Sequence, residues 1–262
     1  MAKPVKEQKK KAIKYTDAKK VIKQTEEGFV PTAYAVPDGM KRFRFKKAGT
    51  YRLNIIPYIV GKGNPHADEG YAHYCRTFYV HQRVGPNNEA YACRYKNFGE
   101  PCPICEVANK LRAKGRTDDA DKLKPKDRQL YLVQDLDDKE AGVQLFETAY
   151  WKGFGELLAN KVKAGDDEDG YDQFFRLDEG SILKVEVVDD GFKGPDGEVI
   201  AFKSPKNIEM RRRKEPLPDE MLQEMPCLDE LILDVGYDKM KEVFEGGAGG
   251  KSGDEDEDEN EE

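Results

Sequence analysis

Long apolar runs are absent from this chain of 262 residues, and histidine and tryptophan are scarce. No stretch of 18 apolar residues occurs, so we expect no membrane-spanning helix and no membrane partner. The lysine-rich start has no apolar stretch behind it, which disfavours a secretory signal. We therefore expect a protein of the cytoplasm, where thiols stay reduced.

We expect no catalytic activity, and the histidines provide no motif for a catalytic zinc. The three histidines are His66, His73 and His81, and none of them belongs to a His-x-Glu motif that would provide a general base beside a catalytic zinc. A Mg²⁺-dependent nuclease would need clustered carboxylates. The acidic run at 165–170 is flanked by glycines, so we expect it to be a solvent-exposed loop rather than a nuclease site.

Charge is distributed unevenly along the chain. The first 24 residues hold nine lysines against Glu7 and Asp17, a local balance of +7. The last nine residues hold eight acids and no base, and without them the net charge would change from −7 to +1. Such blocks are typical of flexible interaction arms. We therefore divide the chain into a basic arm (1–28), a core (29–245) and a glycine-rich hinge with an acidic tail (246–262).

Alternation of apolar and polar residues predicts many short strands. The expected strands lie near 43–45, 51–55, 74–84, 91–93, 129–136, 143–151 and 181–190, with a further strand pair at 191–202. Helical spacing predicts helices at 104–111, 154–162, 218–232 and 237–246. The expected fold class is therefore mainly β with short helices (α+β), built as a small barrel or sandwich.

Three of the five cysteines are crowded into the segment YACRYKNFGEPCPIC. Cys102 and Cys105 form a CxxC pair at the expected start of a helix, and eight residues separate Cys93 from Cys102. In a reducing compartment, a tight group of cysteines is more often metal-binding or catalytic than disulfide-bonded. Zinc takes four such ligands in a tetrahedron, so the segment predicts a zinc site.

The fourth ligand must come from upstream, from His81, Cys75 or His73. His81 and Cys93 flank a Gly-Pro-Asn-Asn turn, and a hairpin across that turn would bring both toward one end of the site. We rank His81 first and Cys75 second. Four protein ligands leave no room for water, so the zinc would be structural. A redox-active CxxC and a set of buried free cysteines are the two alternatives.

Basic and aromatic residues alternate repeatedly, as in KRFRFKK, YACRYKNF and AYWKGF. Single-stranded nucleic acid offers phosphates to lysine and arginine, and exposed base faces to aromatic rings. The alternative is that the rings are core residues and the charges lie on the solvent side of strands. We expect the contact residues to be Arg44, Arg94, Tyr95, Lys96, Lys126, Arg128, Tyr131, Tyr150, Trp151 and Lys152.

Several segments resemble the single-stranded DNA-binding proteins, also called helix-destabilising proteins, of T-even and related bacteriophages. FYVHQRV followed by YACRYKNFGEPCPIC resembles the zinc segment of that family. RLNIIPY, RQLYLVQDLDDKEAGVQLFETAYWKGFGELL and SILKVEVVDDGF resemble its strands and central helix. The resemblance selects His81, Cys93, Cys102 and Cys105 as the four zinc ligands.

The resemblance implies an OB-fold-like barrel with a zinc subdomain inserted at about 66–115, and a cleft between them for the strand. It also implies self-association along the DNA through the basic arm, and contacts between the acidic tail and replication and recombination proteins. Such a protein would coat and protect single-stranded DNA during phage replication, recombination and repair, in the host cytoplasm and without catalysis. The alternative is a zinc-ribbon protein-interaction or transcription factor of a phage.

Overall fold

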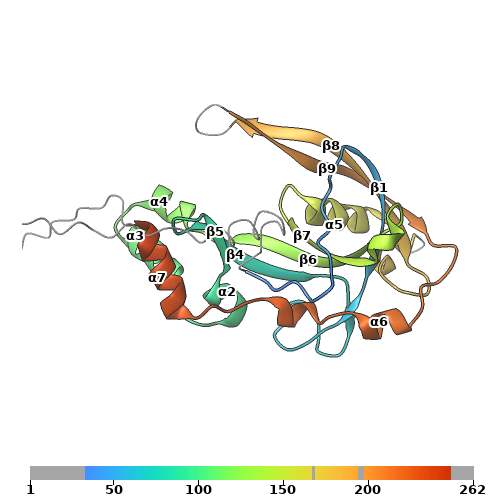
Figure 1. Cartoon of the computed structure of the whole chain (residues 1–262), viewed down its shortest axis with the longest axis horizontal. Coiled ribbons are helices and arrows are strands. Elements are labelled where there is room, and N and C mark those ends of the chain that lie inside the picture. Colours follow the sequence, from blue (N-terminus) through green and yellow to red (C-terminus); the bar gives the residue numbers. More distant parts are fainter. Residues whose placement is uncertain (1–32, 167–168, 194–197, 249–262) are drawn as a thin grey trace, which may run out of the picture. The chain divides into compact units, whose positions relative to one another are not determined.

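The fold is organised around one long strand, β6 (Lys126–Asp135), in an antiparallel sheet of seven strands (Figure 1). The computed structural model describes residues 33–166, 169–193 and 198–248, which all belong to one compact unit. The basic arm expected at 1–28 and the acidic tail lie outside the described residues. No described helix is long and apolar enough to cross a membrane.

Strand β6 has neighbours on both edges. One edge pairs with β7 (Val143–Ala149), and the other pairs first with β4 (Arg76–Val84) and then with β1 (Gly49–Ile56). The sheet extends outward through β5 (Glu89–Ala92) on β4, β8 (Ser181–Lys193) on β1, and β9 (Val199–Arg212) on β8. A short ladder of β2 (Tyr58–Ile59) and β3 (Ala72–His73) lies in the connection from β1 to β4.

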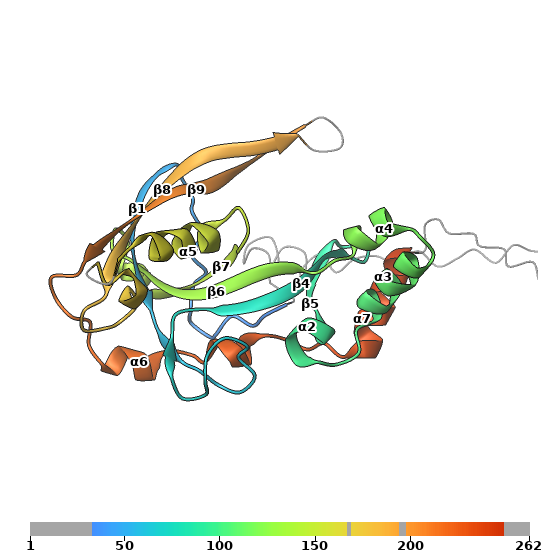
Figure 2. The ribbon, with the colours of Figure 1, turned by 180° about the vertical axis from the view of Figure 1, so that it is seen from behind.

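The helices are short and lie mainly in two groups. The insert between β5 and β6 contains α2 (Arg94–Phe98), α3 (Pro103–Ala113) and α4 (Thr117–Lys122), and α7 (Tyr237–Ala248) packs against it (Figures 1 and 2). Helix α5 (Phe154–Ala164) follows β7, and α6 (Glu220–Glu224) follows β9. Single 3₁₀ turns are η1 (Lys139–Ala141), η2 (Tyr171–Gln173) and η3 (Leu228–Leu231).

Both faces of β6 are covered by apolar side chains. Tyr131 and Val133 pack into one core cluster with Phe146 of β7, whereas Leu130 and Leu132 pack into a second cluster on the opposite face. A strand that is buried on both faces reads as a continuous apolar run, and this explains the segment LYLV in the middle of β6. Because both faces are covered, the aromatic ring of β6, Tyr131, is buried.

Most of the predicted elements are confirmed. In β8, Leu183, Val185 and Val187 are buried whereas Glu186 is exposed, as the alternation predicts. The helices expected at 104–111 and 154–162 fall within α3 and α5. The strand pair expected at 191–202 is also confirmed, since Gly191 to Lys193 pair with Val199 to Ala201, and it continues the strand expected at 181–190 as one long β8–β9 hairpin.

Three predictions of local structure are wrong. Residues 43–45 form no strand, and the preceding residue, Arg42, makes only an isolated bridge to Leu145. The helix expected at 218–232 is divided into α6 and η3 around Pro226, which disfavours helical geometry in the residue before it. Helix α7 extends to Ala248, so the hinge expected from 246 begins within a helix.

The fold class is mixed α and β, mostly an antiparallel sheet with short helices, and in this the prediction is confirmed. The prediction of a barrel is wrong for the described residues, whose strand path begins at β5 and ends at β9 without closing. The reason is the course of β8 and β9. They pair with the sheet through β1 over Gly49–Asn54 and then leave it as a hairpin, instead of curving back toward β5.

Candidate metal centre and adjoining groove

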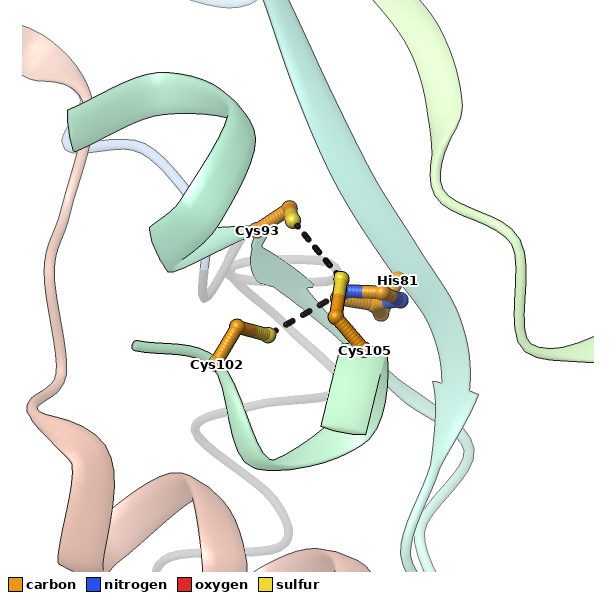
Figure 3. A group of neighbouring side chains, drawn as sticks. All are labelled: His81, Cys93, Cys102 and Cys105. Atoms are coloured by element: carbon orange, nitrogen blue, oxygen red, sulfur yellow. Dashed lines mark hydrogen bonds between the residues drawn. The ribbon is translucent and has the colours of Figure 1, made fainter. Parts of the chain in front are cut away.

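Four side chains from β4 and from the starts of α2 and α3 converge in one cluster (Figure 3). His81 comes from β4, Cys93 lies directly before α2, Cys102 lies directly before α3, and Cys105 lies in the first turn of α3. Their ligand atoms all lie within 4.8 Å of one another. The predicted set of four ligands is therefore brought together, and the cluster could hold a metal ion.

The spacing of the ligand atoms fits a tetrahedral ion. His81 Nε2 lies 3.4 Å from Cys102 Sγ and 3.5 Å from Cys105 Sγ, and Cys93 Sγ lies 3.5 Å from Cys105 Sγ. With zinc–sulfur bonds of about 2.3 Å and a zinc–nitrogen bond of about 2.0 Å, neighbouring ligand atoms in a tetrahedron lie about 3.5–3.8 Å apart. These three distances, of the six between the four atoms, therefore lie close to the edges of such a site.

The histidine is held with the correct nitrogen toward the cluster. His81 Nδ1 lies 2.9 Å from the carbonyl oxygen of Leu123. A carbonyl only accepts hydrogen bonds, so Nδ1 carries the proton and Nε2 is left free to bind a cation. Burial lowers the pKa of His81, but hydrogen bonds with Cys102 and Cys93 outweigh it and raise the pKa to about 9. A bound cation would take the place of that proton on Nε2.

The three thiols compete for negative charge. Hydrogen bonds from Cys105 and Cys93 lower the pKa of Cys102 despite its burial, whereas contacts with Cys102 and Cys93 raise the pKa of Cys105. The backbone N–H of Lys96 also donates to Cys93 Sγ, at 3.5 Å. Ionisation of one thiol therefore disfavours ionisation of its neighbour. A bound divalent cation would offset this repulsion and allow all three sulfurs to be thiolates.

Helix α7 is part of the metal-binding region. Met240, which is fully buried, places its Sδ 3.8 Å from Cys102 Sγ, and Val243 packs so closely that a Cβ on Gly85 would lie 2.7 Å from it. The hydroxyl of Tyr237 donates to Glu106 of α3, at 2.7 Å. The predicted bounds of about 66–115 therefore leave out α4 and α7, which also belong to this region. The helical spacing of the apolar residues Met240, Val243 and Phe244 could have indicated that α7 packs here.

The other ligand candidates lie outside this cluster. Cys75 is buried in the core of the sheet, where Gln129 Nε2 donates to its sulfur at 3.7 Å, and burial raises its pKa to about 12. His73 lies on β3, and burial lowers its pKa. Neither residue belongs to the group of four, so the structure leaves His81 as the fourth ligand.

A groove lined by aromatic rings adjoins the metal-binding region. One hollow of about 300 Å³ is lined by Tyr79, Tyr95, Lys96, Arg112, Lys124 and the cluster residue Cys105. A second hollow of about 470 Å³ is lined by His66, His73, Tyr74, Tyr150 and Trp151. Both hollows include Tyr79 and Asp127, so they adjoin. We call the two together the aromatic groove.

Four of the ten predicted contact residues line this groove. Tyr95 and Trp151 have 60% and 62% of their surface exposed, and Lys96 and Tyr150 lie beside them. The indole N–H of Trp151 donates to Asp127 at 2.7 Å, which fixes the orientation of its ring. The ammonium of Lys96 lies 5.7 Å from the centre of the Tyr79 ring.

The remaining six predicted residues do not line the groove. Tyr131 is buried, and its hydroxyl donates to Gln129 Oε1 at 2.6 Å, so the prediction of a base contact there is wrong. Arg94 and Arg128 are paired with Asp234 and Glu147. The other three, Arg44, Lys126 and Lys152, are exposed but are not among the residues that line the two hollows.

Sequence reasoning also missed residues that line the groove. Tyr79 and Tyr74 belong to the segment YCRTFYVHQR, in which the interleaving of rings and bases was visible. Alternation along β4 could have separated the outward-facing Tyr79 from the buried Phe78. Lys124 begins the run KPKDRQLY, in which the same interleaving was visible. Arg112 carried no such signal, because it enters the groove from α3.

Comparison with models of known protein families and with curated protein sequences found no match to this chain. A function is therefore inferred from the geometry of the His/Cys cluster and from the residues that line the aromatic groove.

Proposed function

We propose that this chain binds single-stranded DNA in the aromatic groove and has no catalytic role. The observation that supports this most directly is the composition of the groove. Exposed rings of Tyr95 and Trp151 line the same groove as Lys96, Arg112 and Lys124. Bases would stack on the rings, at about 1–3 kcal/mol for each base, while phosphates meet the cations.

The mechanism is preferential binding to one state of the DNA. A duplex hides its base faces in the stack, so only the unpaired strand can use Tyr95 and Trp151 together. A ligand that binds one state shifts the equilibrium toward it by mass action. The protein would therefore remove hairpins and protect the strand that it coats.

The ion that we propose in the cluster is a single structural Zn²⁺. Three cysteine sulfurs and one imidazole nitrogen are a donor set that zinc prefers, and four protein ligands close the coordination sphere. The same residues fix α2 and α3, which carry Tyr95, Lys96 and Arg112 to the groove. The ion would thus hold one wall of the groove in place.

The biological setting follows from the resemblance to the T-even phage family. We propose that the chain is such a protein, acting in phage DNA replication, recombination and repair in the host cytoplasm. The basic arm at 1–28 would join neighbouring copies along the strand, and the acidic tail would contact replication and recombination proteins.

The single tryptophan supplies a direct test, since Trp151 lies in the groove. Titration with oligo(dT) should quench its fluorescence as a base stacks on the ring, and affinity should fall steeply with salt. A duplex of the same length should quench far less. Equal or tighter binding of duplex would contradict the proposal. Weak, salt-insensitive binding without quenching would favour a zinc-ribbon protein-interaction factor.

A further inference from the structure

The outer half of the β8–β9 hairpin carries an exposed apolar surface that the proposed function does not use. Strand β8 pairs with β1 only as far as Val187, and beyond that point β9 is its only strand partner among the described residues. Both views show this part of the hairpin extending away from β1 (Figures 1 and 2). We call residues 188–193 and 199–204 the β-arm.

The three largest apolar side chains of the β-arm gather on one face. Phe192 pairs across the strands with Ile200, and Phe202 lies two residues farther along, so all three side chains point to the same side. The rings of Phe192 and Phe202 lie 6.1 Å apart. Their exposed fractions are 50% for Phe192, 46% for Ile200 and 43% for Phe202, and none of them belongs to a core cluster of the described residues.

The outer edge of β9 is also unpaired within the part of the chain that the structure describes. Exposed edges are normally protected by charged side chains, proline or a bulge. The run from Val199 to Phe202 contains none of these, and Val199 is 67% exposed. A two-stranded ribbon is only marginally stable alone in water, so a further strand on this edge would stabilise it.

The charges of the β-arm disfavour a nucleic acid as the occupant. Lys203 is paired with Asp189, and Lys206 at its base is paired with Asp190 at 2.7 Å. Within the β-arm itself, Asp189 and Asp190 balance Lys193 and Lys203, so it offers little net attraction to phosphate. What the β-arm offers to a partner is an apolar face and the backbone hydrogen-bonding groups along the outer edge of β9.

The sequence of the edge is complementary to itself. In an antiparallel pair of two β9 strands centred on Ala201, Ile200 of each copy faces Phe202 of the other, and Val199 faces Lys203. No like charges meet, and two apolar–aromatic pairs form on the face that carries Phe192. We infer that the β-arm pairs with the β-arm of a second copy of this chain, through β9 to β9, to give a continuous four-stranded ribbon. This inference does not depend on DNA binding.

Two substitutions, each of which adds one negative charge, distinguish this specific strand pairing from non-specific apolar association. Phe202→Glu sets a carboxylate against Ile200 of the other copy and should raise the dimer dissociation constant at least about tenfold. Val199→Glu removes the most exposed apolar side chain, but it places the carboxylate opposite Lys203 on the face away from Phe192. It disturbs neither of the apolar–aromatic pairs and should leave dimerisation intact. A loss of dimer in both variants would indicate an unspecific apolar contact and would overturn the register.

Sedimentation velocity of the full chain without DNA, at about 1 M NaCl, is the measurement. At that ionic strength contacts between the charged arm and tail are screened, whereas apolar strand pairing persists. The mass should double with rising protein concentration for the unsubstituted chain. A monomer throughout, or an unchanged dimer in Phe202→Glu, would refute the inference. So would a loss of oligo(dT) affinity in Phe202→Glu without any change in mass, because the β-arm would then be a DNA contact.

Cross-linking tests the register independently. Antiparallel pairing centred on Ala201 brings the two copies of that residue to about 4.5–5.5 Å between Cα atoms, which a disulfide can span. Ala201→Cys should therefore form a disulfide-linked dimer under mild oxidation. Glu198→Cys, which is also exposed and lies three residues away, should not. Cross-linking of Glu198→Cys in preference to Ala201→Cys would contradict the register.

Discussion

The guanidinium of Arg94 donates to both carboxylate oxygens of Asp234, at 2.7 and 3.1 Å, although 140 residues separate them. Arg94 also donates to the carbonyl oxygen of Pro101, at 2.8 Å. The pair joins the residue after the ligand Cys93 to the segment that leads into α7. Arg94 therefore acts as a tether of the metal-binding region, in a position where the sequence had suggested a phosphate contact.

Arg94→Ala should lower the stability of the α7 contact by about 1 kcal/mol, the size expected of a partly exposed bidentate pair, with little change in DNA affinity. The hydrogen bond from Arg94 lowers the pKa of Asp234. A lowered folded-state pKa contributes stability above the unfolded value of about 3.9, and this stability is lost as pH falls through the folded value. A double-mutant cycle with Asp234→Ala, followed by thermal melts at pH 7 and pH 3, measures the coupling. An equal coupling at both pH values would exclude the ion pair.

Cys102→Ser should abolish tight zinc binding and loosen α2, α3 and α7 together, because structural zinc supplies about 10–16 kcal/mol of apparent binding energy in small zinc domains. Elemental analysis and hydrogen exchange report the two effects. Cys227→Ser is the matched control, since Cys227 is a half-buried thiol outside the cluster. Full zinc content in Cys102→Ser, or equal loss in the control, would contradict the assigned ligands.

Tyr95→Ala and Trp151→Ala should each weaken oligo(dT) binding by about 1–3 kcal/mol, because each removes a stacking ring from the groove. Tyr71→Ala is the control, since Tyr71 is 67% exposed but is not among the residues that line the groove. Fluorescence anisotropy with labelled oligo(dT) serves all three variants. A comparable loss in Tyr71→Ala would place the DNA elsewhere.

Lys124→Gln should reduce the salt dependence of binding, since a lysine that neutralises one phosphate of a single strand contributes about 0.7 to the slope of log K against log salt. Lys124 lines the groove. Lys139 in η1 does not line it, so Lys139→Gln is a charge-matched control. The measurement is the slope of log K against log salt between about 50 and about 300 mM NaCl for both variants and the unsubstituted chain. An unchanged slope in Lys124→Gln would remove this residue from the contact surface.

Tyr131→Phe should cost about 1 kcal/mol of stability and leave DNA affinity unchanged. The hydroxyl of Tyr131 donates to Gln129 Oε1, and Gln129 in turn donates to Thr77 Oγ1 at 3.2 Å, so its removal breaks a buried network. Denaturant unfolding gives the free energy of unfolding, and oligo(dT) titration of the same preparation gives the DNA affinity. A loss of affinity without a loss of stability would restore Tyr131 as a base contact.

Short-range patterns in the sequence determined most strands and the His/Cys cluster that could hold a metal ion. The spacing from Cys93 to Cys105 and the turn after His81 place four ligands together, because a CxxC pair and a hairpin each fix geometry within a few residues. Alternation in β8 identified the buried face for the same reason, since the side-chain period of a strand is local.

Only the tertiary structure decided which aromatic rings are accessible and which elements surround the metal cluster. Tyr131 and Trp151 read alike in the sequence, but β6 is covered on both faces, whereas Trp151 lies beyond the end of β7. The joining of Arg94 to Asp234, and the open course of β8 and β9 in place of a barrel, depend on contacts between distant residues. Burial and long-range pairing are set by which surfaces meet in the folded chain, and no periodicity within one segment records that information.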